Sequence, residues 1–96
     1  GYIECLSKDI VVEVPGIINK SGISGISFKE YPAAFGSLLN LQSGVIQMTT
    51  DAVLNSSKHS AYLALLADPV VNDSHQAERL LNNMLKTQSK FLGYLK

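Results

Sequence analysis

The chain has 96 residues, 46% of them hydrophobic, and its eight basic residues cancel eight acidic ones. A chain of this length forms one small domain with a limited core, and its scattered charges give no footprint for nucleic acid or for an anionic membrane. No apolar run approaches the roughly 20 residues of a membrane span, and no basic stretch precedes an apolar core at the start, so we expect neither a membrane span nor a signal peptide. Because Cys5 is the only cysteine, an internal disulfide is excluded and a reducing, cytoplasmic location is expected.

Residues 9–25, DIVVEVPGIINKSGISG, predict one β-hairpin near the start of the chain. The run IVVEV at 10–14 is almost wholly β-branched and ends before Pro15, which indicates a strand. Its apolar side chains do not alternate with polar ones, as in a strand that is buried on both faces.

The second half of the hairpin follows from its turn. In NKSG, at 19–22, Gly22 can adopt the positive φ that ends a hairpin loop. Residues 23–28, ISGISF, then predict the returning strand, with Gly25 as a bulge.

A long helix is predicted to begin at Pro32, whose fixed φ suits a first helical turn. Glycines at 36 and 44 each cost a helix about 1 kcal/mol relative to alanine, so we expect a neighbouring element, in this chain or outside it, to pack closely there. The apolar positions on one face of this helix are Phe35, Leu38, Leu41, Val45, Met48 and Ala52.

Two further helices are predicted from their capping residues. Ser57 caps the segment KHSAYLALLA, which must end by Asp68 because Pro69 follows. Asp73 and Gln76 resemble a capping box that opens a third helix. The apolar positions of that helix are Ala77, Leu80, Leu81, Met84, Leu85, Phe91, Leu92 and Leu95.

The residues that most often carry chemistry form no constellation. His59 and His75 lie on different predicted helices, and neither has a second ligand at i+3 or i+4, so exposed or capping-region histidines are expected instead of a metal site. Cys5 has no base predicted beside it, and we expect a buried, inert thiol.

The carboxylates also have local explanations. Asp73 is expected to cap a helix and Asp68 to end one, and the remaining acids are assigned to solvent and turns. The stretch SGISG at 21–25 lacks the strand, glycine fingerprint and helix order of a nucleotide-binding loop.

The first 25 residues resemble the segment just beyond the catalytic core of glycoside hydrolase family 4, which reads G-x-I-x-N-L-P-x-D-x-V-V-E-V-P. Cys5 stands where that family usually has Asn, and Ser7-Lys8 replaces Pro-x. The matching residues here are Gly1, Ile3, Leu6, Asp9, Val11, Val12, Glu13, Val14 and Pro15.

The likeness continues to the end of the chain. Residues 49–54, TTDAVL, and 65–69, LLADP, match the family's helix and the D-P-x-V motif that follows it, and 77–96 resemble its final helix. Gly25, where many members have Pro, and the helix sequence of 38–54 are closer to the α-glucosidase and α-galacturonidase-like members than to the 6-phosphoglycosidases.

The resemblance implies a larger parent enzyme. Members of the family bind NAD on an N-terminal dinucleotide-binding domain and hold a divalent metal, commonly manganese, through a Cys and a His. They oxidise the sugar at C3, which acidifies the proton on C2, and a base then removes this proton as the glycosidic oxygen leaves. Water adds to the unsaturated intermediate, and the hydride returns to the sugar. The residues responsible lie upstream of the matched region, so no catalytic, NAD-binding or metal-binding residue is expected here, and Cys5, His59 and His75 are not the family's metal ligands.

Three functions for this chain are compatible with these observations. The first is a non-catalytic C-terminal fragment of such a glycosidase, lining the sugar cleft and the subunit contacts of a homo-oligomer; a start at Gly1 without Met indicates a fragment. The second is a stand-alone interaction module, and the third a small autonomous enzyme, which lacks a catalytic cluster. We expect the first, with an α+β fold in which 1–30 form a hairpin region and 31–96 a helical region, and with no nucleic-acid or membrane partner.

Overall fold

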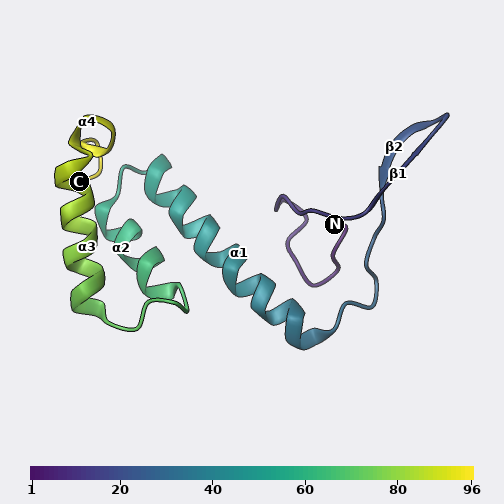
Figure 1. The fold of residues 1–96 in the computed structure, drawn as a ribbon, viewed down its shortest axis with the longest axis horizontal. Coiled ribbons are helices and arrows are strands. Elements are labelled where there is room, and N and C mark those ends of the chain that lie inside the picture. Colours follow the sequence, from purple (N-terminus) through teal and green to yellow (C-terminus); the bar gives the residue numbers. More distant parts are fainter. The chain divides into compact units, whose positions relative to one another are not determined.

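The computed structural model describes all 96 residues and contains a two-stranded sheet followed by helices, as Figure 1 shows. The expected α+β class, a short hairpin followed by helices, is confirmed. In chain order the elements are β1 (Gly16–Asn19), β2 (Gly22–Gly25), α1 (Ala33–Leu54), α2 (Lys58–Ala67), α3 (Ser74–Thr87) and α4 (Ser89–Leu92).

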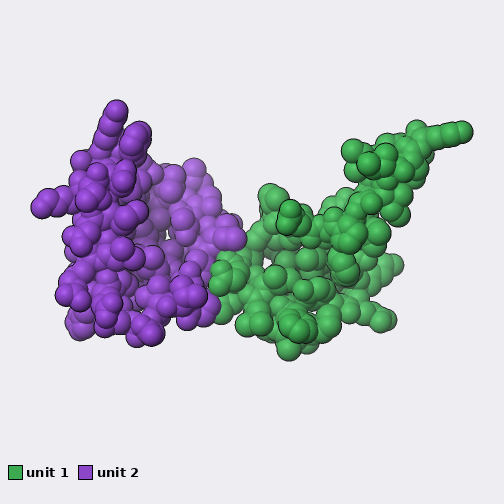
Figure 2. Space-filling model, in the orientation of Figure 1, with its two compact units in different colours: residues 1–43 green, residues 44–96 purple.

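The chain forms two compact units, residues 1–43 and residues 44–96, which are coloured separately in Figure 2. Their boundary lies inside α1, so this helix contributes its first half to unit 1 and its second half to unit 2. The regions expected from the sequence, 1–30 and 31–96, separate strands from helices. They are therefore defined differently from these compact units.

The hairpin turns where the sequence predicts. Asn19 accepts a hydrogen bond from the Ser21 N–H through its side-chain oxygen at 2.8 Å, and Gly22 has a φ of 111°. The predicted bulge at Gly25 is wrong, because Gly25 pairs directly with Gly16. Gly25 instead lies close to Tyr2: a Cβ on Gly25 would lie 2.6 Å from Cε1 of Tyr2, so the tyrosine ring would have to shift.

The strand predicted at residues 10–14 is wrong, because the first strand of the hairpin lies further along the chain. These residues form no ladder, the strands are β1 and β2 instead, and Val11 is 96% exposed in this chain. Strand propensity mainly measures how well a side chain packs against neighbouring strands. The only other strand pairing in the chain is an isolated parallel bridge between Ile3 and Phe28.

Helix α1 begins one residue after Pro32, as predicted, and the Pro32 carbonyl accepts from the Gly36 N–H at 2.9 Å. The expected close packing at Gly36 is confirmed, and the neighbour belongs to this chain, because a Cβ there would lie 2.7 Å from Cys5 Sγ. At Gly44 no atom lies within 4 Å of the corresponding position, so the expectation fails within this chain. On the predicted apolar face only Ala52 is buried.

Helices α2 and α3 have the predicted caps. The Ser57 side chain accepts from the Ser60 N–H at 3.1 Å, and α2 ends at Ala67. The Asp73 carboxylate accepts from the Gln76 N–H at 3.0 Å and from the Gln76 side-chain amide at 3.1 Å. The glutamine therefore bonds to the capping carboxylate, whereas in a capping box it would reach the backbone N–H.

The predicted third helix is divided in two near Gln88. The Thr87 hydroxyl donates to the Asn83 carbonyl at 2.8 Å, and Gln88 leaves helical geometry with φ −105° and ψ 24°. Such back-bonding from a threonine hydroxyl competes with the helical ladder. The short helix α4 follows.

The end of the chain lies beside the start of α2. The Lys96 N–H donates to the Ser56 carbonyl at 3.0 Å, and the Lys58 N–H donates to the Lys96 carbonyl at 2.9 Å. These bonds close unit 2. The buried residues of this unit are Ala52, Ala64, Ala77 and Leu81.

Candidate functional site

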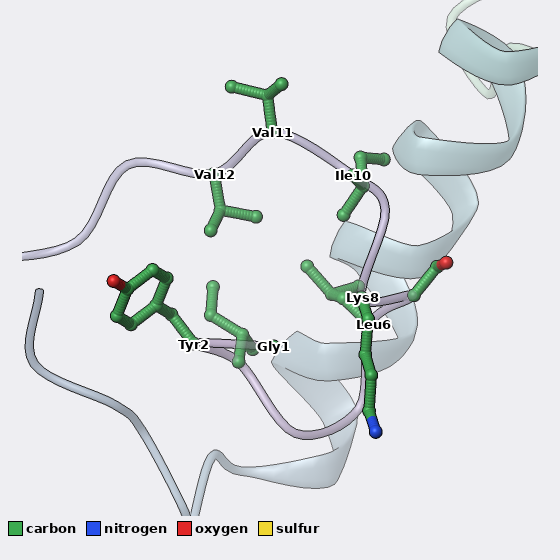
Figure 3. A pocket seen from close by; sticks show the side chains of 9 residues that line it. Gly1, Tyr2, Leu6, Lys8, Ile10, Val11 and Val12 are labelled. Carbon is green, nitrogen blue, oxygen red and sulfur yellow. The ribbon is translucent and has the colours of Figure 1, made fainter.

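The first twelve residues of unit 1 fold around a cup of about 260 Å³, drawn in Figure 3. We call it the N-terminal cup. It coincides with the stretch that carries most of the motif recognised in the sequence. Its lining residues are Gly1, Tyr2, Ile3, Leu6, Ser7, Lys8, Ile10, Val11 and Val12.

Turns and one bridge hold the cup together. The Leu6 N–H donates to the Ile3 carbonyl at 3.1 Å, and the Phe28 N–H donates to the Tyr2 carbonyl at 2.6 Å. Ile3, at 7% exposure, is the only large apolar side chain that unit 1 buries. The cup is therefore anchored by one buried residue and by the segment that follows the hairpin.

The lining of the cup is mainly apolar. Figure 3 shows the Tyr2 ring and the Leu6 and Val12 side chains around the hollow, whereas the Val11 side chain points away from it and the Lys8 side chain extends from the loop with its amine far from Tyr2. Lys8 is the only charged residue among those that line the cup. The arrangement offers concave apolar surface, and it carries no acid–base pair.

The three residues with potential chemistry lie apart. His59 on α2 and His75 on α3 are both exposed, in agreement with the exposed histidines predicted. Cys5 is exposed, so its predicted burial is wrong, although its sulfur packs against Gly36. No group of three or more His, Cys, Asp or Glu residues is placed to hold a metal ion.

A second hollow, of about 320 Å³, lies in unit 2 between the first turns of α2 and the middle of α3. Its lining includes His59 of α2 and Glu78 of α3, which the sequence alone does not assign to one hollow. The Tyr62 hydroxyl donates to the Ser74 carbonyl at 3.3 Å and ties these helices together.

The carboxylates that the sequence assigns to helix ends are found there. The Asp68 side chain accepts from the Val70 N–H at 3.1 Å. The hydrogen bond from the Gln76 N–H lowers the pKa of Asp73 below its ordinary 3.8, because it stabilises the ionised carboxylate. Both acids therefore have structural roles.

No helix of the structure combines the length and the apolar character that a membrane crossing requires.

Comparison with known proteins places the chain in a class. Residues 1–71 match the family 4 glycosyl hydrolase C-terminal domain, and the chain belongs to this family. The matched region contains the N-terminal cup, the hairpin, α1 and α2. The resemblance read from the motifs is thereby confirmed.

Two curated relatives extend over the whole chain. It is 35% identical over 96 residues to a protein named alpha-glucosidase from Erwinia rhapontici, and 28% identical over 95 residues to Phospho-alpha-glucosidase PagL from Clostridium acetobutylicum. Both names contain α-glucosidase, as expected, but the second names a phospho-α-glucosidase, so the expected distance from the 6-phosphoglycosidases is not shown. The chain spans only 21% of the length of each relative, about one fifth. No solved structure is significantly similar to it.

Proposed function

We propose that this chain is a non-catalytic C-terminal part of an NAD- and divalent-metal-dependent glycoside hydrolase that cleaves α-glucosidic bonds through C3 oxidation and elimination. The observation that carries the proposal is the family match over residues 1–71 in a chain that spans one fifth of two α-glucosidase relatives. Four fifths of each relative lie outside the matched part, which leaves ample length for a catalytic region. The comparisons favour this function over a stand-alone interaction module.

The residues of this chain do not fit NAD or manganese. The N-terminal cup has an apolar lining with no cluster of backbone N–H groups at a helix start, and no set of ligands for a cation is assembled. In the proposal both groups are held by the remainder of the polypeptide, and no step of the reaction is assigned to this chain.

The contribution of this chain is then structural. The N-terminal cup and the hairpin carry exposed apolar side chains, among them Tyr2, Ile18 and Ile23, and such surface is typical of a region that packs against other protein. We assign the cup to the wall of the sugar cleft and the exposed helix faces to contacts with the catalytic region and between subunits, in a cytoplasmic homo-oligomer. The names of the two relatives differ in whether the glucoside carries phosphate. The assay below therefore includes both kinds of substrate.

The experiment compares the complete polypeptide of the source gene with the 96-residue chain. Each is incubated with NAD and Mn²⁺ and assayed against a nitrophenyl α-glucoside and its 6-phosphate. The complete polypeptide is expected to hydrolyse one of them, only with both cofactors present, whereas the 96-residue chain gives the buffer rate.

Turnover by the 96-residue chain would overturn its non-catalytic role. A complete polypeptide that starts at Gly1, or that lacks glycosidase activity on an α- and β-glycoside panel with both cofactors, would overturn the enzyme assignment.

A further inference from the structure

The second hollow of unit 2 has no part in the proposed function, and we call it the lysine hollow. It has a volume of about 320 Å³. Most of its lining residues are polar or charged, in contrast to the N-terminal cup, where Lys8 is the only charged residue. The residues that line the lysine hollow are Lys58, His59 and Tyr62 of α2, Glu78 and Leu81 of α3, and Lys96.

Two lysines from distant parts of the sequence meet at this hollow. Lys58 begins α2, and its N–H donates to the Lys96 carbonyl at 2.9 Å. The Lys96 N–H in turn donates to the Ser56 carbonyl at 3.0 Å. These backbone bonds hold two positively charged side chains at one site, where they repel each other. An anion placed between them replaces this repulsion with attraction.

The donors available at the hollow belong to side chains. The backbone N–H of Ser60 is already bonded to the Ser57 side chain at 3.1 Å, and that of Lys58 is bonded to Lys96. The start of α2 is therefore occupied by its own chain. The ammonium groups of the two lysines each carry three N–H donors, and the lysines outnumber Glu78, the single acidic residue of the lining.

Glu78 limits what kind of anion fits. An ionised carboxylate only accepts hydrogen bonds, and it repels a phosphate group. A ligand that also carries hydroxyl groups can donate to Glu78 while its phosphate lies beside the lysines. The buried Leu81 and the half-buried Tyr62 offer apolar surface to the carbon atoms of such a ligand.

The size of the hollow agrees with a ligand larger than a free phosphate ion. A cavity of about 150 Å³ is enough to bind benzene, and the lysine hollow is larger than that. The Tyr62 hydroxyl, which donates to the Ser74 carbonyl at 3.3 Å, fixes one wall by joining α2 to α3.

We propose that the lysine hollow binds a phosphate monoester of a small polyol. The phosphate lies between the ammonium groups of Lys58 and Lys96, and the hydroxyl groups donate to Glu78. The ligand is bound and released without any covalent step. Glu78 and Lys96 lie beyond residue 71, so this site is not implied by the family match.

The test is a titration of the 15N-labelled chain, followed by the amide resonances of residues 58–62 and 78–81. Two glycines are added after Lys96, so that the terminal carboxylate does not lie in the hollow. The probes are glycerol 3-phosphate, inorganic phosphate and glycerol, at equal ionic strength. Glycerol 3-phosphate is expected to saturate with a Kd below about 10 mM, inorganic phosphate to bind about threefold more weakly or worse, and glycerol to give no saturation.

Substitutions assign the binding to the lysines. Lys58→Gln and Lys96→Gln should each weaken the binding of glycerol 3-phosphate about threefold or more. The matched control is Lys20→Gln, which makes the same change of charge in the hairpin turn, does not line the hollow, and should leave Kd within about 1.5-fold. The 15N spectrum itself reports whether each variant keeps its fold.

Glu78→Gln gives a result of opposite sign. It removes the repulsion of the phosphate, so inorganic phosphate should bind about twofold more tightly or better. Glycerol 3-phosphate should gain less, because an uncharged amide oxygen is a weaker acceptor for its hydroxyl groups than a carboxylate.

The absence of saturation by glycerol 3-phosphate up to about 20 mM overturns the proposal. Inorganic phosphate that binds as tightly as the ester, shifts confined to residues 1–12, or lysine variants that bind like Lys20→Gln overturn it as well. No arm of the test uses a glycoside, NAD or Mn²⁺, so this site and the proposed function fail separately.

Discussion

The two units reach order by different means. Unit 2 buries four residues from three helices, and two of these helices begin at side-chain caps. Unit 1 buries one large apolar residue, Ile3, and exposes Ile18 and Ile23, which face each other across the hairpin at 80% and 82% exposure. A two-stranded hairpin is only marginally stable in water. We therefore expect unit 2 to fold through its own contacts, and unit 1 to need the covering protein that the proposed function supplies.

The difference matches the division of roles in the proposed enzyme. The motif that identifies the family lies mainly in unit 1, the unit with the smaller core of its own. A segment that packs against a larger protein has its apolar side chains covered by that protein. The comparison between the units can be tested by substitutions.

The largest effect is expected from the buried residues. Leu81→Ala should cost about 2–5 kcal/mol of unfolding free energy, because it leaves a cavity between α2 and α3. Ile3→Ala should remove the one buried side chain that anchors the N-terminal cup, with loss of amide protection confined to unit 1. Urea unfolding followed by circular dichroism measures the first, and residue-resolved hydrogen exchange measures the second. Loss of protection in α3 after Ile3→Ala would contradict the independence of the units.

The helix caps give the next largest effect and a pH dependence. Ser57→Ala should cost about 1 kcal/mol at every pH, since a hydroxyl does not titrate in the accessible range. Asp73→Ala should destabilise α3 only where the carboxylate is ionised.

The pKa of Asp73 is lowered on folding, so its contribution is complete above the ordinary value of 3.8 and disappears as pH falls through the folded-state pKa. Thermal melts at pH 7 and at about pH 2 should therefore show Asp73→Ala converging on the wild type at the acidic pH, while Ser57→Ala stays below it. An Asp73→Ala deficit that is equal at both pH values would refute the role of ionisation.

Alanine substitutions at the two glycines of α1, Gly36 and Gly44, should change stability less than the loss of a helix cap, and each serves as the control for the other. Gly44→Ala has open space around the new Cβ and should stabilise the helix by about 0.5–1 kcal/mol. Gly36→Ala brings its Cβ to within 2.7 Å of Cys5 Sγ, so the cysteine must move and the gain is reduced or reversed. Removing the sulfur with Cys5→Ala should restore the gain at Gly36. Equal stabilisation by both single substitutions would show that Cys5 does not pack there.

The smallest effect is expected at Val11. Because this side chain is 96% exposed, Val11→Ser should change the stability of the 96-residue chain by less than about 0.5 kcal/mol. In the complete polypeptide the same substitution should cost more, since the proposal places covering protein over this segment. A loss above about 1 kcal/mol in the 96-residue chain would show that Val11 is already packed.

The sequence predicts the helical region well because its signals are local. Side-chain bonds from Ser57 and Asp73 set the starts of α2 and α3, and both bonds are present in the structure. Pro69 limits the other end of α2, which stops at Ala67. The division of the last helix at Gln88 was not predictable, because no glycine or proline marks it, and the threonine bond that precedes it also occurs within the uninterrupted helix α1.

The sequence predicts unit 1 less well because the missing information is not local. The run at 10–14 is favourable for a strand, yet no other strand in the chain lies beside it, and the ladder forms in the next segment. The turn was predicted correctly at Gly22, whose positive φ is a property of a single residue. The cup itself has no sequence signature apart from its family motif.

The most direct test of the account is residue-resolved hydrogen exchange of the 96-residue chain beside the complete polypeptide. In the 96-residue chain we expect slow exchange in α2 and α3 and nearly unprotected amides through residues 9–25. In the complete polypeptide we expect residues 9–25 to become protected as the rest of the enzyme covers them. Strong protection of this segment in the isolated chain, or no added protection in the complete polypeptide, would contradict the claim that unit 1 is completed from outside.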